Sequence, residues 1–210
     1  REFGLDLPQG PAAVLAQVST WLADEESPIP PALRPALTEL ITEIRTLDTR
    51  ITAIENQLRA QAKPRPEVQR LMAVPGIGLL IATALIAAVG GMEAFRNGRH
   101  LAAWLGLTPR ESSSGQRRCL GGISKRGDRY LRMLFIHGAR AALLAATRQA
   151  QAGKKPLTRL QRWAVDLAAR VGHNKAACAL ANKLARIAFA VVRQGRAFDG
   201  DFVAVPAHAV

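Results

Sequence analysis

The sequence predicts an all-α protein in which a long coiled-coil-type helix precedes a compact helical domain with a helix-hairpin-helix-like element. Composition points this way first, because hydrophobic residues make up 49% of the 210 residues while aromatic residues make up only 5%. Such a chain favours helices packed closely through small side chains such as alanine. Apolar residues also recur at helical spacing along residues 32–60, and two short apolar helices flank a glycine turn within residues 68–91.

Residues 32–62 carry the most regular apolar pattern in the chain. The apolar positions alternate steps of four and three, which is the spacing of a coiled-coil seam. One interpretation is a helix that packs a narrow face on its own domain. We favour a homo-oligomer formed through residues 33–58, because so narrow a stripe buries little unless a second helix covers it. The seam positions are Leu33, Leu37, Leu40, Ile44, Leu47, Ile51, Ile54 and Leu58.

Residues 1–31 are expected to be an N-terminal linker or remnant, with one short helix over 11–23. Five prolines punctuate this stretch, and the cluster SPIPP at 27–31 is typical of a linker. The sequence KPRP at 63–66 ends the long helix, since proline cannot donate a backbone hydrogen bond and disfavours helix in the preceding residue. A compact domain is expected over 63–196, followed by a flexible tail over 197–210.

Residues 68–91 predict a helix, a tight turn and a second helix. Gly76 and Gly78 in the turn can bring bare backbone N–H groups close to phosphate at a helix N-terminus. This pattern is similar to the helix-hairpin-helix motif, which positions DNA without reading its sequence. The alternative is an ordinary connection between two core helices, because the second helix is strongly apolar.

The segment 108–132 is predicted to be a polar, glycine-rich, cationic loop that opens a helix at Asp128. It carries seven basic and two acidic residues, with three consecutive serines at 112–114. Arginine side chains and a helix N-terminus both favour phosphate, although a solvated basic loop is the plainer alternative. The candidate nucleic-acid-binding residues are Gly76, Gly78, Arg110, Arg117, Arg118, Lys125, Arg126, Arg129 and Lys175.

Three further helices are predicted, over 128–149, 157–171 and 175–194, with Asp128 and Asn174 as N-caps. His137 is expected to be a core histidine, whereas His100 is expected to be solvated or bonded to the backbone. The predicted core positions of the first two helices are Leu131, Leu134, Phe135, Gly138, Ala142, Ala145, Leu160, Trp163, Leu167 and Val171.

Charge is divided unevenly along the chain. Residues 1–62 carry a net charge of −4 and residues 63–210 a net charge of +17, so the basic part is expected to meet a polyanion. No apolar run approaches the roughly 20 residues of a membrane-spanning helix, so no membrane association is expected. The two cysteines are far apart in sequence and form no metal-type pair, which fits a reducing cytoplasm.

Several motifs in this order resemble one family. They are VPGIG at 74–78, FRNGRHLAAWLGLTPR at 95–110, SSSG at 112–115, GGISKRGDRYLR at 121–132 and HNKAACALANKLAR at 173–186. Over residues 32–194 the chain resembles the C-terminal domain of insertion-sequence transposases of family one-hundred-and-ten, eleven-eleven branch, to which Piv-type DNA invertases are related.

This resemblance implies a bridge-RNA-guided DNA recombinase of the bacterial cytoplasm and nucleoid. The family's nucleophile is the serine directly before a glycine, which implies Ser114 here, with Ser113 as the alternate. Members pair this domain with an N-terminal RuvC-like domain whose DEDD carboxylates hold Mg²⁺. No such strand set precedes the serine segment here, so neither a metal site nor a cofactor is expected within these residues. Recombination by this chain alone is therefore not expected. The alternative is a non-catalytic fragment that binds nucleic acid and dimerises.

Overall fold

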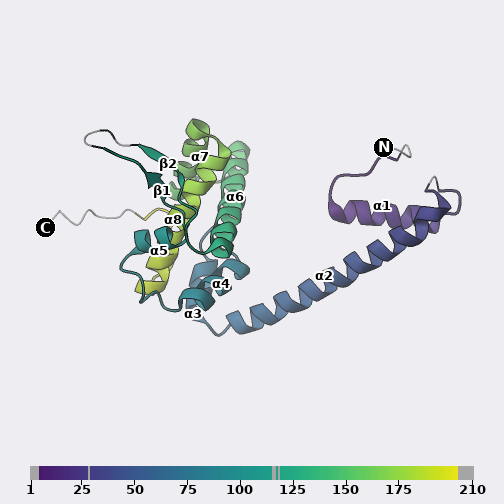
Figure 1. The fold of residues 1–210 in the computed structure, drawn as a ribbon, viewed down its shortest axis with the longest axis horizontal. Helices are drawn as coiled ribbons and strands as arrows, with labels where there is room; N and C mark the ends of the chain where they lie inside the picture. The colour runs from purple at the N-terminus through teal and green to yellow at the C-terminus, as the bar shows by residue number, and fades with distance from the viewer. Residues whose placement is uncertain (1–4, 28, 115–116, 118, 203–210) are drawn as a thin grey trace. The chain divides into compact units, whose positions relative to one another are not determined.

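The computed structural model describes residues 5–27, 29–114, 117 and 119–202, and these residues are predominantly helical, as the sequence predicts. The chain divides into two compact units, residues 1–57 and residues 58–210. Figure 1 shows the helices of each unit and the short sheet of the second. None of the described helices is long and apolar enough to cross a membrane.

The N-terminal unit contains helix α1 (Pro11–Ala23), the short helix η1 (Pro31–Leu33) and most of α2 (Arg34–Ala62). A proline at the first turn of α1 suits a helix start, because its missing N–H has no partner there in any case. The linker before α2 is held by the Arg34 guanidinium, which donates to the carbonyl oxygens of Glu25, Ser27 and Ile29 at 3.0–3.2 Å.

Helix α2 is unbroken over 29 residues, which confirms the long helix. Its predicted seam is mostly exposed within the chain. The side chains of Leu40, Ile44, Leu47, Ile51 and Ile54 are 40–58% exposed, while Ile41, just beside the seam, is buried. The described chain therefore leaves an apolar stripe uncovered along α2, and self-association through it stays a prediction.

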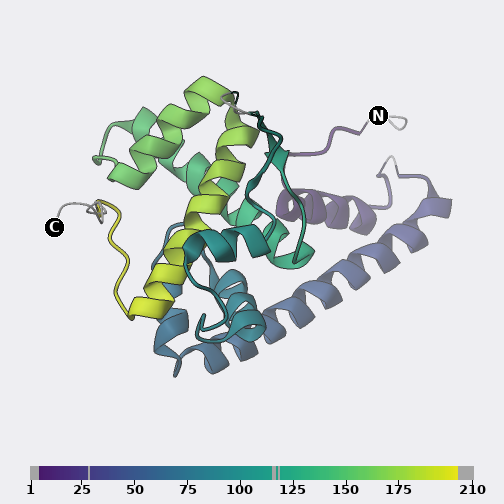
Figure 2. The ribbon, with the colours of Figure 1, turned by 60° about the vertical axis from the view of Figure 1, so that its left-hand side comes forward.

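The C-terminal unit packs its helices around α8 (His173–Gln194). Helices α3 (Pro66–Met72), α5 (Gly98–Trp104), α6 (Arg129–Ala152) and α7 (Arg159–Val171) all contact α8, and Figure 2 shows α8 running through the middle of this unit. Five of the eight buried residues of α8 are alanines, so neighbouring helices can approach its backbone closely. At the start of α5, a Cβ on Gly98 would lie 2.9 Å from the Cα of Arg186.

Helix α4 (Leu79–Val89) follows α3 after the Pro75–Gly78 turn, as the sequence predicts, and packs against α6. Asp128 caps α6, because its side chain accepts a hydrogen bond from the backbone N–H of Leu131 at 2.7 Å. The N-terminus of α7 has a capping box built by Thr158 and Gln161. His100 is exposed and its Nδ1 accepts from the Arg96 N–H at 3.5 Å, as expected.

The predicted loop before α6 contains strands, which is a correction. Strands β1 (Pro109–Glu111) and β2 (Leu120–Ile123) pair antiparallel in a two-stranded sheet. Three of the β2 residues and all of β1 are exposed. Because the strands bury no alternating apolar face, the period-2 pattern that announces a strand in sequence is absent.

Four expectations about single residues are wrong. Asn174 does not cap α8, since the helix begins at His173 after Gly172 and Asn174 instead accepts a hydrogen bond from Arg140 at 3.1 Å. His137, Ala145 and Val171 are exposed rather than buried. In the second half of α6 the buried residues are Ala139, Leu143 and Ala146. A straight helix has 3.6 residues per turn, so the positions that face its neighbours drift away from a strict heptad spacing.

The expected flexible tail is described only as far as Phe202. The Gly200 carbonyl accepts from the Leu160 N–H at 3.1 Å, and the Asp201 carboxylate accepts from the Arg159 N–H at 2.6 Å. These bonds fasten the start of the tail to the N-terminus of α7, where a carboxylate is favoured by the free N–H groups and the helix dipole.

Candidate nucleic-acid interface

The segment between β1 and β2 places the candidate serines on an exposed hairpin. Beyond the two strands, the Ser112 N–H donates to the Cys119 carbonyl at 2.9 Å. Further out, Ser114 and Arg117 exchange two backbone hydrogen bonds of 3.2 and 3.0 Å. Ser114 thus lies where the antiparallel ladder ends, held by its backbone with its side chain exposed.

The two candidate serines differ in their partners. The Ser113 hydroxyl donates to Glu111 Oε1 at 2.8 Å and accepts from the Cys119 N–H at 3.2 Å. Among the described residues, the Ser114 hydroxyl has no hydrogen-bond partner. Ser113 is therefore engaged in holding the hairpin together, whereas Ser114 can turn to a ligand. The sequence indicated no general base for the serine. In the structure the Glu111 carboxylate accepts a hydrogen bond from the hydroxyl of Ser113 and not from that of Ser114.

The base of the hairpin is fixed to the helical core. The Ser124 N–H donates to the Thr108 carbonyl at 2.7 Å, and the Lys125 N–H to the Gly106 carbonyl at 3.1 Å. Gly127 has a φ of +100° and lies so close to the Trp104 carbonyl that no Cβ would fit. Lys125 itself has a φ of +57°, a conformation that non-glycine residues adopt at a cost. Backbone packing therefore sets where the Lys125 side chain leaves the core.

A large groove of about 1740 Å³ opens beside the hairpin. Its walls come from β1, β2 and the following turn, from α7 and α8, and from residues 196–202. Seven basic side chains and one acidic side chain, Asp199, line it among the residues that the structure describes. The basic ones are Arg110, Lys125, Arg159, Lys175, Lys183, Arg186 and Arg196.

The structure brings together only some of the predicted binding residues. Arg110, Lys125 and Lys175 line the groove, although they are far apart in sequence. Arg117 is exposed at the end of the hairpin, and Arg126 and Arg129 are exposed outside the groove lining. Arg118 lies outside the described residues.

Gly76 and Gly78, in the turn between α3 and α4, have different roles. Gly78 is exposed at the N-cap of α4 with no side-chain cap, so the first N–H groups of that helix are open to a ligand. Gly76 is instead packed against Gly138 of α6. The glycine at position 76 is thus explained by packing.

Sequence reasoning predicted Lys175 of α8 but missed the other basic residues that α7 and α8 contribute to the groove, which are Arg159, Lys183 and Arg186. The Lys183 ammonium lies 4.0 Å from the centre of the Trp163 ring, a cation–π contact. The pKa of Lys183 is lowered by burial first, and then by the positive charges of Arg186 and Arg159. The signal was present in the sequence, since Lys175, Asn182 and Arg186 recur along one face of α8.

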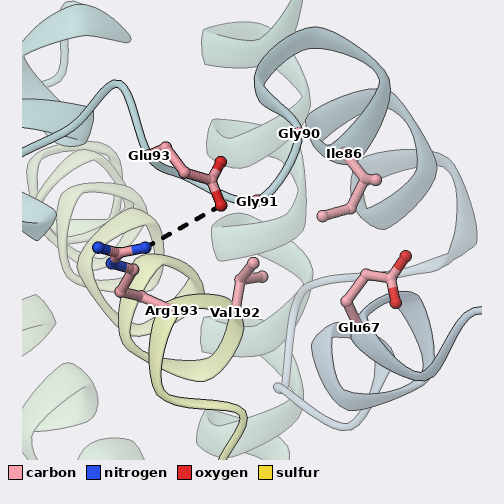
Figure 3. A pocket seen from close by; sticks show the side chains of 7 residues that line it. All are labelled: Glu67, Ile86, Gly90, Gly91, Glu93, Val192 and Arg193. Carbon is pink, nitrogen blue, oxygen red and sulfur yellow. Dashed lines mark ion pairs between the residues drawn. The ribbon is translucent and has the colours of Figure 1, made fainter.

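A second, smaller hollow of about 380 Å³ lies elsewhere in the C-terminal unit (Figure 3). Glu67, Glu93 and Arg193 supply its charged groups, and Arg193 Nη1 lies 4.0 Å from Glu93 Oε1. Both side chains are more than half exposed, so this ion pair stabilises the fold little.

No three His, Cys, Asp or Glu side chains gather as metal ligands among residues 5–27, 29–114, 117 and 119–202. These described residues therefore offer no cluster of ligands for Mg²⁺.

Comparisons with known proteins show similarity to transposases. The family model "Transposase IS116/IS110/IS902 family" matches residues 68–155. The "Probable family 20 transposase" of Pseudomonas aeruginosa is 44% identical over 192 residues, which cover 91% of this chain and 55% of that protein. The "Transposase for insertion sequence element IS1111A" of Coxiella burnetii is 38% identical over 192 residues, covering 91% of this chain and 51% of that protein.

A more distant relative is the "Pilin gene-inverting protein" of Moraxella bovis, 30% identical over 166 residues, which cover 74% of this chain and 47% of that protein. The chain thus spans about half the length of the curated relatives it matches. The family match falls on α3 through α6 and includes the whole serine hairpin. Over most of its length this chain is similar to about half of the insertion-sequence transposases that it matches, and residues 68–155 match the model of the IS116/IS110/IS902 family.

Proposed function

We propose that this chain binds DNA through the cationic groove and the serine hairpin, and that Ser114 is the nucleophile that cleaves a DNA strand. The observation that carries the proposal is the position of Ser114. Its hydroxyl is exposed at the end of a ladder whose base opens onto a groove lined by seven basic side chains. Cationic side chains of this kind neutralise phosphates and hold a duplex in place without reading its sequence.

In the proposed step, Ser114 Oγ attacks the phosphorus of a phosphodiester. The Oγ–P bond forms, the bond from phosphorus to the 3′ oxygen breaks, and a 5′-phosphoserine link remains. The serine proton is transferred overall to the departing 3′ oxygen, which leaves as a hydroxyl. The phosphoserine link keeps the energy of the broken phosphodiester bond. The 3′ hydroxyl of a second strand can therefore attack the same phosphorus and release the serine hydroxyl. The basic side chains would stabilise the charge that develops on the phosphate.

Glu111 and Ser113 take a positioning role in this proposal. Their hydrogen bond, together with the bond from the Cys119 N–H, holds the hairpin in register directly beside Ser114. A serine needs a base or strong polarisation of its target to react, and Glu111 reaches the hydroxyl of Ser113 rather than that of Ser114.

The family resemblance extends the proposal to partners beyond these residues. A guide RNA and a Mg²⁺-binding DEDD domain would belong to the complete transposase, in the bacterial cytoplasm and at the nucleoid. The metal would supply phosphate activation from that domain, and the residues described here offer no site for it. Self-association through the exposed stripe of α2 would bring two serine domains together for exchange.

The test is to trap the covalent protein–DNA link in a full-length transposase that contains this segment, with its guide RNA present. We expect Ser114→Ala to abolish the denaturant-resistant adduct and recombination, and Ser113→Ala to reduce both only partly. If Ser113→Ala abolished the adduct and Ser114→Ala did not, the assignment would be one residue off. If both variants recombined normally, the serine mechanism would be wrong.

A non-catalytic module that binds nucleic acid and dimerises is the second candidate. It is favoured by the absence of a base at Ser114 among the described residues. Under this alternative, Ser114→Ala leaves every measured property of the full-length protein unchanged, including the amount of adduct.

A further inference from the structure

The groove is not a purely polar surface. Apolar side chains of α7, α8 and the C-terminal segment line it together with the cations. Trp163 is half-buried there and contributes ring surface to the lining. The larger apolar members include Leu107, Leu160, Trp163, Leu167, Ile187, Val191 and Phe198.

Positive charge is concentrated at one part of this groove. Burial lowers the pKa of Lys183 most, and the positive charges of Arg186 and Arg159 nearby lower this pKa further. Asp199 is the one acidic side chain that lines the groove among the described residues, and it accepts a hydrogen bond from the Asp201 N–H at 2.9 Å. An anion bound at these three cations would relieve the repulsion.

We propose that this groove binds an unpaired stretch of nucleic acid, with a base taking the place of the Lys183 ammonium on the Trp163 ring and adjacent phosphates held by Lys183, Arg159 and Arg186. The proposal rests on nucleic-acid binding as proposed above and names the form of the ligand. DNA and RNA single strands share the chemistry that the groove recognises.

The lining around Trp163 favours a single strand over a duplex in this part of the groove. A duplex presents phosphates and sugars outward, and its stacked bases cannot reach an aromatic ring that is half-buried in a hollow. Proteins that hold single strands combine a cationic groove with aromatic rings on which bases stack. The groove, at about 1740 Å³, exceeds the roughly 300–1,000 Å³ of a typical small-molecule pocket, so it offers room for several nucleotides.

The experiment measures dissociation constants of the 210-residue chain by fluorescence anisotropy. The labelled probes are an oligo-dT and an oligo-rU of about twelve nucleotides, within the span of known single-strand sites, and a DNA duplex. We expect Trp163→Ala to weaken single-strand binding about tenfold or more, while duplex binding changes little. Trp163→Phe, which keeps a ring, should retain most of the affinity. The relative loss for dT and rU shows which strand the groove prefers.

Two controls separate this idea from general electrostatics and from misfolding. Arg170→Ala removes an exposed charge from the same helix outside the groove lining, and it should weaken all probes slightly and equally. Circular dichroism checks that Trp163→Ala stays folded, and Lys183→Met tests the same groove while the Trp163 ring is kept, although its cation–π contact is lost.

Three results would overturn the proposal. The first is single-strand affinity that is unchanged in both Trp163→Ala and Lys183→Met while the unmutated chain still binds the probes. This result would leave nucleic-acid binding intact and would show that the single strand does not bind at Trp163 and Lys183. Equal weakening for duplex and single strand would refute the unpaired ligand. A dimer that dissociates on Trp163→Ala would show that a second copy fills the groove. If no probe binds the unmutated chain, the DNA-binding proposal itself fails.

Discussion

A Cβ atom on Gly76 would lie 2.7 Å from the carbonyl oxygen of Gly138. The turn between α3 and α4 therefore packs backbone against backbone on α6, with no space for a side chain on either glycine. Gly76 also has a φ of +89°, which L-residues adopt with strain. The same turn that resembles a phosphate-binding hairpin is a core contact.

We expect Gly76→Ala to destabilise the fold by at least about 2 kcal/mol, because overpacking and positive φ both act against alanine there. Urea unfolding followed by circular dichroism measures this. Gly121→Ala, where the nearest atom would be 3.7 Å from the new Cβ, serves as a control and should cost much less. Equal stability of the two variants would contradict the packing role of Gly76.

Gly78 offers the opposite test, since nothing lies within 4 Å of a Cβ built there. Asp is a good N-cap and favours the helix dipole, so Gly78→Asp should leave stability unchanged or raise it by roughly 0.3–1 kcal/mol. If the turn binds phosphate, the same change should weaken DNA binding through charge repulsion, while the uncharged cap in Gly78→Asn should not. Equal DNA affinity of the two variants would remove this turn from the interface.

Sequence could predict the helices because their periodicity and stop signals are local. The proline start of α1, the Asp128 cap and the seam of α2 all follow from neighbouring residues. The hairpin could not be predicted, because its strands bury no apolar face. The groove could be predicted only in part, because Lys125 and Lys175 meet Arg159 and Lys183 through tertiary packing that no local pattern encodes.

The exposed stripe of α2 predicts association of the chain. Ile44→Asp with Ile51→Asp should convert the associated form to a monomer, because charge in a seam between helices is poorly solvated. Thr42→Asp with Thr49→Asp places the same charge at exposed positions on the opposite face and should leave the oligomer intact. Sedimentation at tens of micromolar, about where a coil of this length associates, measures both. A monomeric unmutated chain would count against the stripe as an interface.

Lys183→Met should not lower the stability of the free protein. The ordinary lysine pKa of 10.5 is lowered in the fold, so folding disfavours the protonated amine. This penalty is present in full at neutral pH and fades only as the pH rises from the lowered pKa towards the ordinary value. We expect the melting temperature at pH 7 to stay the same or rise, with Lys175→Met as an exposed control. A fall of about 2 °C or more would show that the charge stabilises the fold.

The central claim is that the groove beside the serine hairpin is the nucleic-acid interface, and the salt dependence of binding tests it most directly. The logarithm of the affinity of the 210-residue chain for a DNA duplex is measured against the logarithm of salt concentration. The triple variant Arg110→Ala, Lys125→Ala, Lys175→Ala should lower the slope by about 0.9 for each phosphate that it no longer neutralises. Arg148→Ala, Lys155→Ala, Arg170→Ala removes equal charge outside the groove lining and should leave the slope nearly unchanged. An unchanged slope in the first variant, or an equal fall in both, would contradict the account.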